Sequence, residues 1–209
     1  MDTCKRVEEA LGVEKTNEIV LFMNGLMKNR GVTQYVHNQL SLLDIPAWLK
    51  DAIFTATGGR IDVNGKRFAL EAGKLYHEIV SHSDEDKEAL RGQKAYSENN
   101  IFEVIETMLF PDIIEGISYG DTLDQRKVFA VEKYLGHNII IVLSVGGNRN
   151  PNVTPQQIVY FNNDKWITLT KSGMTMREIL YGSSKKRRII PEELNEIKRN
   201  RVTVAHYES

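Results

Sequence analysis

The stretch from Arg126 to Ser172, RKVFAVEKYLGHNIIIVLSVGGNRNPNVTPQQIVYFNNDKWITLTKS, decides the fold because it holds the longest run of strand-forming residues. Apolar and β-branched residues dominate four segments that turn-forming residues separate, which is typical of antiparallel strands. We therefore predict one four-stranded antiparallel sheet. Its strands are expected at residues 127–134, 138–145, 156–162 and 165–171.

The residues before this stretch favour helices. Apolar residues recur with helical spacing in residues 5–29, and residues 32–43 are expected to continue that helical layer. Asn64-Gly65 predicts the turn of a small hairpin. Two further helices are expected after Gly73, the second capped by Ser97 and ended by Pro111. The predicted fold class is α+β, with an N-terminal helical region followed by helices packed on the sheet.

The chain divides into three expected parts. Residues 1–70 form the helical N-terminal region with its small hairpin, and residues 71–182 form an α+β domain. Residues 183–209 form a basic C-terminal tail with a short helix.

Composition limits the class of protein. Apolar residues make up 41% of the chain and charged residues 26%, a balance typical of a globular protein. No run approaches the ~18–20 apolar residues of a membrane span, so we expect no membrane partner. The N-terminus, MDTCKRVEEALG, is amphipathic and carries acidic residues, so it resembles neither a signal peptide nor a transit peptide, and we expect a cytoplasmic protein. A single cysteine, Cys4, excludes an internal disulfide.

Charge is distributed unevenly along the chain. Residues 71–124 hold four Lys/Arg against thirteen Asp/Glu, whereas residues 125–209 hold fourteen against seven. The basic part, which contains the predicted sheet, is suited to a polyanionic partner such as RNA. The alternative is that the two parts compensate each other within one molecule.

The last predicted strand has two different faces. Side chains alternate along a strand, so Ile167 and Leu169 are expected to face the helices. The opposite face would present Trp166, Thr168, Thr170 and Ser172. An aromatic ring beside three hydroxyls is suited to holding a sugar-phosphate chain by stacking and hydrogen bonds. The alternative is an ordinary half-solvated strand, in which threonine is also favoured.

Two histidines are candidates for proton transfer. His77 and His82 are five residues apart, which places them ~140° apart on a helix and makes a shared metal ion unfavourable. The sequence contains neither a Cys/His cluster nor a nucleotide-binding glycine motif, so we expect no metal and no cofactor. A histidine at the end of this helix is a candidate general acid or base. The alternative is a solvated surface histidine.

Four cations are candidates for phosphate binding. Arg91, Arg126, Lys127 and Arg149 could neutralise a phosphate group or the charge of a transition state. The alternative, which is the commoner outcome for a single cation, is a solvated surface charge.

The segment from Tyr76 to Ser172 resembles the phage-associated branch of the barnase/EndoU/colicin/RelE-like nucleases, which occurs in phage head-morphogenesis proteins and polymorphic toxins. The likeness is carried by YHEIVSHSDEDKEALRGQKAYSENNIFEVIETMLFPDII, residues 76–114, followed by strands in the expected order. It covers about half of the chain. The sequence departs from the family in the acidic run after His82 and in a last strand without histidine.

The resemblance implies a metal-independent endoribonuclease that works by acid–base catalysis. It implies that His77 and His82 transfer protons, that Lys127 or Arg126 supplies the first-strand cation, and that the hydroxyls of the last strand hold the developing charge. The bacterial host cytoplasm or the phage virion is the expected location. Two alternatives stay open: a non-enzymatic virion-associated or host-protein-binding protein with the same fold, and an inhibitor that mimics nucleic acid with its acidic part.

Overall fold

The computed structural model describes residues 2–29, 38–117, 127–147, 149–181 and 191–204. These residues form an α+β structure around a seven-stranded sheet in the order β1-β2-β6-β5-β4-β3-β7. The sheet is mixed, because β2 and β6 run parallel whereas the other neighbours are antiparallel. The predicted four-stranded antiparallel sheet is therefore wrong.

The strands are β1 (Gln39–Asp44), β2 (Arg67–Glu71), β3 (Ile113–Gly116), β4 (Lys127–Tyr134), β5 (Asn138–Val145), β6 (Asn152–Phe161) and β7 (Val202–Thr203). The helices are α1 (Thr3–Leu11), α2 (Val13–Lys28), α3 (Ala47–Ala56), α4 (Ala72–His82), α5 (Glu85–Leu90), α6 (Ile101–Leu109), α7 (Asn163–Lys171), α8 (Met176–Tyr181) and α9 (Pro191–Asn200). A single 3₁₀ turn, Glu98–Asn100, precedes α6.

Strands β4 and β5 form the central hairpin, and the predicted bounds of both are confirmed. Their residues pair from Lys127 with Val145 to Tyr134 with Asn138. Gly136 lies in the connecting turn with a φ of +78°, a conformation that favours glycine. β5 is apolar at nearly every position because both faces of the sheet are covered, so that its side chains are buried in either direction.

The segment predicted as the fourth strand is a helix, α7. The side-chain oxygen of Asn162 accepts a hydrogen bond from the amide of Asp164 at 2.9 Å, and this N-cap starts the helix. Trp166 and Leu169, three residues apart, share the helix face that packs on the sheet. Ile167, expected to point inward, is instead 47% exposed. The capping residues of this segment outweigh the strand preference of its β-branched residues.

The N-terminal region contributes to the sheet. Residues 39–43, expected to be helical, lie in β1, which pairs antiparallel with β2. Gly65 forms the predicted turn with a φ of +68°, but the strand after it pairs with β1 and not with the residues before the turn. Val7 and Ile19 lie in the same buried cluster as Ile141 of β5, so the first 70 residues share a core with the sheet.

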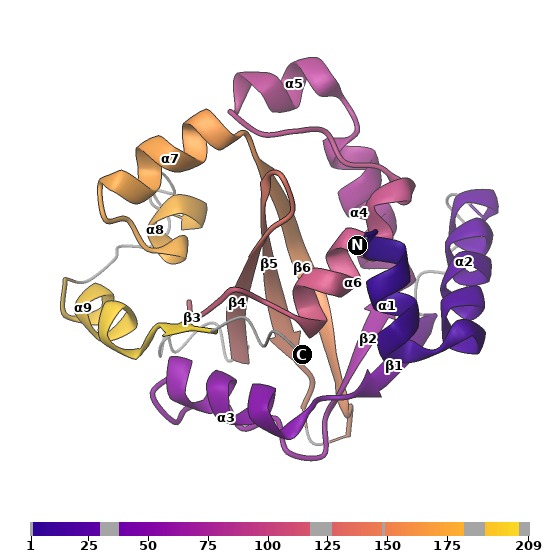
Figure 1. Ribbon diagram of the computed structural model, residues 1–209, viewed down its shortest axis with the longest axis horizontal. Coiled ribbons are helices and arrows are strands. Elements are labelled where there is room, and N and C mark those ends of the chain that lie inside the picture. Colours follow the sequence, from indigo (N-terminus) through magenta and orange to yellow (C-terminus); the bar gives the residue numbers. More distant parts are fainter. Residues whose placement is uncertain (1, 30–37, 118–126, 148, 182–190, 205–209) are drawn as a thin grey trace.

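Helices cover the sheet on both sides (Figure 1). On the first face, β4 and β5 pack against α6 and β6 packs against α4, while α1 packs on α6 and α2 packs on α4 and β1. On the second face, Ile140 and Phe161 pack against α7 and α8. None of the described helices is both long and apolar enough to cross a membrane.

Candidate functional site at the edge of β6

Strand β6 has an edge that β2 covers only in part. β2 pairs with β6 through Asn152 and Val153 alone. Farther along β6, the amide of Ile158 donates to a carboxylate oxygen of Glu78 at 3.1 Å, and the carbonyl of Tyr160 accepts from the amide of Lys94 at 2.9 Å. Helix α4 and the segment after α5 therefore satisfy backbone groups that a neighbouring strand would otherwise satisfy.

His82, the last residue of α4, lies beside this edge between two buried carboxylates. Its Nδ1 is 3.2 Å from Oε2 of Glu88, a close contact without the alignment of a hydrogen bond. Its Nε2 is 3.8 Å from Oε2 of Glu78. The side chain of His82 is 22% exposed, so solvent and a ligand can reach the ring. Arg91 completes the cluster, because its Nη1 donates to Oε1 of Glu88 at 2.7 Å.

Glu78 is the member of the cluster whose pKa is shifted by its surroundings. Burial raises the pKa of the Glu78 carboxyl, whereas the amide of Ile158 and the nearby histidines His82 and His77 lower it. A carboxylate beside a histidine ring orients the ring. The cluster therefore holds one accessible imidazole that can accept and return a proton.

A groove of about 700 Å³ lies on the second face, next to the same edge. Strand β6, helices α7, α8 and α9, and the residues after α5 form its walls. Its apolar lining residues are Val159, Phe161, Leu169, Met174, Ile179, Leu180 and Leu194. Its polar lining residues are Arg91, Gln93, Gln157, Lys165 and Glu178. Arg91 thus contacts the histidine cluster and also lines the groove.

Two cations, Arg91 and Lys165, line the groove. Gly92 has a φ of +70°, and a Cβ atom there would lie 2.9 Å from Cγ of Lys165. The aliphatic part of Lys165 therefore packs against the backbone beside Arg91, and glycine makes this approach possible. Arg91 is paired with Glu88, whereas Lys165 has no ion-pair partner within the described part of the chain. Unpaired positive charge beside a groove favours an anionic ligand.

His77, Lys127 and Arg149 were also predicted for proton transfer or phosphate binding, and they do not join this site. His77 is exposed on α4, outside the cluster. Lys127 begins β4 and pairs with Val145, which in turn pairs with Val153 at the far end of β6 from the groove. From Val153 to Phe161 the strand extends by roughly 25 Å. Arg149 is exposed at that far end, after β5. Arg126 lies outside the described residues.

The predicted row of hydroxyls does not exist, because α7 is a helix. Thr168 Oγ1 donates to the Asp164 carbonyl at 2.9 Å, and Thr170 Oγ1 donates to the Trp166 carbonyl at 2.9 Å. Ser172 Oγ donates to the Leu169 carbonyl at 2.6 Å. The three hydroxyls are thus bonded to the backbone of their own segment, a common arrangement for these residues in helices.

Trp166 is likewise no surface platform for stacking. It is buried on the second face, with its ring centroid 5.5 Å from that of Phe161. Among the predicted site residues that the structure describes, only His82 and Arg91 are therefore brought together.

Sequence reasoning missed most of the partners of these two residues. Glu78 stands four residues before His82, a helical spacing that could have indicated the pair. Glu88 and Lys165 had no such signal, because they reach the site from other elements.

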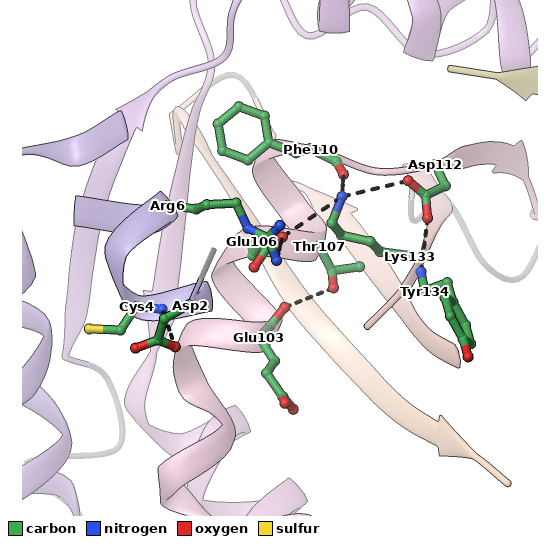
Figure 2. Close-up of polar contacts among 10 residues, drawn as sticks. All are labelled: Asp2, Cys4, Arg6, Glu103, Glu106, Thr107, Phe110, Asp112, Lys133 and Tyr134. Carbon is green, nitrogen blue, oxygen red and sulfur yellow. Dashed lines mark hydrogen bonds and ion pairs between the residues drawn. The ribbon is translucent and has the colours of Figure 1, made fainter. Parts of the chain in front are cut away.

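A second polar cluster lies on the first face (Figure 2). Glu106 of α6 is buried and pairs with Arg6 of α1 at 2.8 Å. Lys133 donates to the Phe110 carbonyl at 2.7 Å and lies 3.5 Å from Asp112. These groups compensate each other's charge and fasten α1 and β4 to α6, so the cluster has a structural role.

Metal binding has no support in the described residues, where no group of three His, Cys, Asp or Glu side chains is placed to hold an ion. Comparison of the chain with protein-family models, curated proteins and solved structures finds no match.

Proposed function

We propose that the protein is an acid–base endoribonuclease with His82 as its catalytic residue. The observation that supports this proposal is the position of Arg91, which contacts the His82 cluster through Glu88 and also lines the groove with Lys165. An accessible imidazole, a carboxylate that orients it and two phosphate-binding cations are the groups that cleavage of RNA requires.

In the proposed reaction the neutral imidazole of His82 takes the proton of a ribose 2′-hydroxyl. The 2′-oxygen forms a bond to the adjacent phosphorus while the bond from phosphorus to the 5′-oxygen breaks. The imidazolium then gives its proton to the leaving 5′-oxygen. The products are a 2′,3′-cyclic phosphate and a free 5′-hydroxyl, and His82 returns to its neutral form.

The other residues hold the substrate and the histidine. Glu88 orients the ring of His82 and stabilises the imidazolium, which makes it a positioning residue. Arg91 and Lys165 bind the phosphate and the negative charge that develops on it. The acidic run of α5 repels RNA less than its composition implies, because Glu88 is buried against Arg91 and Asp84 caps the helix through the amide of Lys87.

The test is cleavage of single-stranded RNA in EDTA by the wild-type protein and two variants. His82→Ala should lower the rate by at least about 100-fold, because positioned acid–base groups contribute on that order. His77→Ala is the matched control, since His77 is exposed on the same helix and lies outside the cluster, and its rate should not change. His82→Gln, which keeps a polar group beside Glu88, separates loss of proton transfer from loss of folding.

Two results would contradict the proposal. One is the absence of cleavage by folded wild-type protein, and the other is an unchanged rate in both His82 variants. A DNA strand of the same sequence should remain intact, because it lacks the attacking 2′-hydroxyl. Arg91→Ala and Lys165→Ala should raise KM, with a larger effect at low salt.

The apolar lining of the groove favours a second candidate function. Seven apolar side chains line it, more than phosphate binding requires. A non-enzymatic protein that binds a phage structural protein or a host protein would use such a groove for an apolar side chain of its partner. Folded protein that binds a partner through Leu169 and Ile179 but cleaves no RNA would support this second candidate.

A further inference from the structure

We infer that the groove holds an unpaired base of single-stranded RNA and that Gln93 and Gln157 bind the hydrogen-bonding edge of that base. This inference rests on the proposed nuclease function and names the substrate class of that site. Three observations carry it: the free amides of the two glutamines, the bulge that aims Gln157, and the apolar walls of the groove.

The two glutamine amides are available to a ligand. Gln93 and Gln157 line the groove, and neither side chain has a hydrogen-bond partner among the residues that the structure describes. Gln156, the neighbour of Gln157, differs in this respect, because its Nε2 donates to Thr154 Oγ1 at 3.2 Å. A free amide presents a donor and an acceptor side by side, the pattern that pairs with the edge of a base.

A bulge in β6 directs Gln157 into the groove. Val142 of β5 pairs with Gln157, but the next residue, Leu143, pairs with Pro155, so Gln156 is an extra residue in β6. The extra residue inverts the alternation of side chains along the strand. Val153, before the bulge, belongs to the first face, and Gln157 after it lies on the second. In an unbroken strand Gln157 would point to the core between the sheet and α4.

The apolar walls fit the flat faces of a base. Leu169 and Ile179 on the helices can contact such faces, whereas Val159 and Phe161 on the strand are buried beneath them. The volume of about 700 Å³ lies in the range of small-molecule sites and is large enough for a nucleotide. A base in a duplex is stacked and paired, so it would have to leave the helix before it could enter. Arg91 and Lys165 at the rim would bind the phosphates on either side.

The test measures binding and cleavage of three fluorescein-labelled RNA ligands in EDTA. They are a single strand, its annealed duplex, and the same strand with abasic sites at its central positions. The single strand should bind at least about tenfold more tightly than the other two, because a bound base contributes stacking and edge contacts. Gln157→Ala should weaken single-strand binding about tenfold and leave abasic binding unchanged. Gln156→Ala, the matched control outside the groove, should change neither.

The outcomes separate the two proposals. If all three ligands bind alike and are cleaved alike, the base inference is wrong and the nuclease proposal stands. If no ligand is cleaved by folded protein, the nuclease proposal is wrong. If Gln157→Ala weakens single-strand and abasic binding equally, Gln157 contacts the backbone of the RNA and not its base, and the inference is again overturned.

Discussion

Replacing Glu132 with glutamine should stabilise the protein at alkaline pH. Glu132 lies on the second face of β4 and is only 3% exposed. Burial raises the pKa of its carboxyl from 4.5 to about 7, against the opposing effects of the Asn138 amide and Arg201. At pH 8 the folded protein therefore carries a buried carboxylate, one oxygen of which has no hydrogen-bond partner within the described residues.

The size of the effect follows from proton linkage. A carboxyl with a raised pKa binds its proton more tightly in the folded state, so its contribution to stability is complete below pH 4.5. The contribution is lost as the pH rises through about 7. A difference of this size corresponds to a loss of roughly 3 kcal/mol in the free energy of unfolding. Glutamine keeps the acceptor for Asn138, which donates to Glu132 Oε1 at 2.8 Å, and removes the charge.

The assay is urea denaturation of wild type and Glu132→Gln at pH 5 and pH 8.5. Subtracting one protein from the other cancels the titration of groups that do not interact with Glu132, including the buried Glu78. Glu115 is not cancelled, because its charge also raises the pKa of Glu132. The difference in unfolding free energy should move in favour of the variant by roughly 2 to 3 kcal/mol between the two pH values. Glu9→Gln, on the exposed side of α1, is the control and should show no such change. A difference that is the same at both pH values would refute the reasoning.

Two further predictions test the packing. Trp166→Ala should destabilise the protein by about 3 kcal/mol or more, because Trp166 fills the second face, whereas Ile167→Ala should cost less than about 1 kcal/mol. Thermal unfolding of the two variants measures both costs. A strand at these positions, as the sequence predicted, would make Ile167→Ala the more destabilising of the two. Arg6→Ala should cost about 2 kcal/mol of stability, because it leaves the buried carboxylate of Glu106 with only the more distant Lys133 as a partner. Lys5→Ala is the control, since Lys5 is exposed. Equal melting temperatures for both variants would contradict the structural role of the ion pair between Arg6 and Glu106.

The elements that the sequence predicted well carry their signals locally. β4 and β5 are long apolar strands around Gly136, and their ends follow from that pattern. Ser97 forms the expected cap, with a reciprocal hydrogen bond from its amide to the side chain of Asn100 at 3.0 Å. In both cases the residues that determine the structure lie within a few positions of each other.

The elements that the sequence predicted wrongly depend on distant contacts or on ambiguous turn residues. β1 is short, and its strand conformation depends on pairing with β2, whose residues lie about 30 positions later in the chain. Asn162 and Asp164 are favoured both in hairpin turns and at helix N-termini, so the same residues support either structure. If Asn162 and Asp164 form a turn, residues 165–171 are expected to be a strand, and a row of hydroxyls on one face of that strand follows.

The candidate site was predictable only where its residues stand on one helix. Glu78 and His82 are four residues apart on α4, but the groove combines β6 with α7, α8 and α9 and with the residues that follow α5. No spacing within the sequence indicates that Lys165 lies against Gly92. The bulge at Gln156 is equally invisible, because the strand pattern on each side of it is regular and only the pairing with β5 shows the extra residue.

The two roles of Glu78 determine which substitutions can reveal catalysis. Its carboxylate accepts a hydrogen bond from the amide of Ile158 and so completes the edge of β6. The same carboxylate oxygen lies 3.8 Å from Nε2 of His82. Loss of activity in a Glu78 variant would therefore be ambiguous, because removing the carboxylate also leaves a buried backbone amide without its acceptor. The His82 ring has no such backbone partner among the described residues. For this reason the comparison of His82 with His77, on one helix with unequal surroundings, is the experiment that separates chemistry from folding.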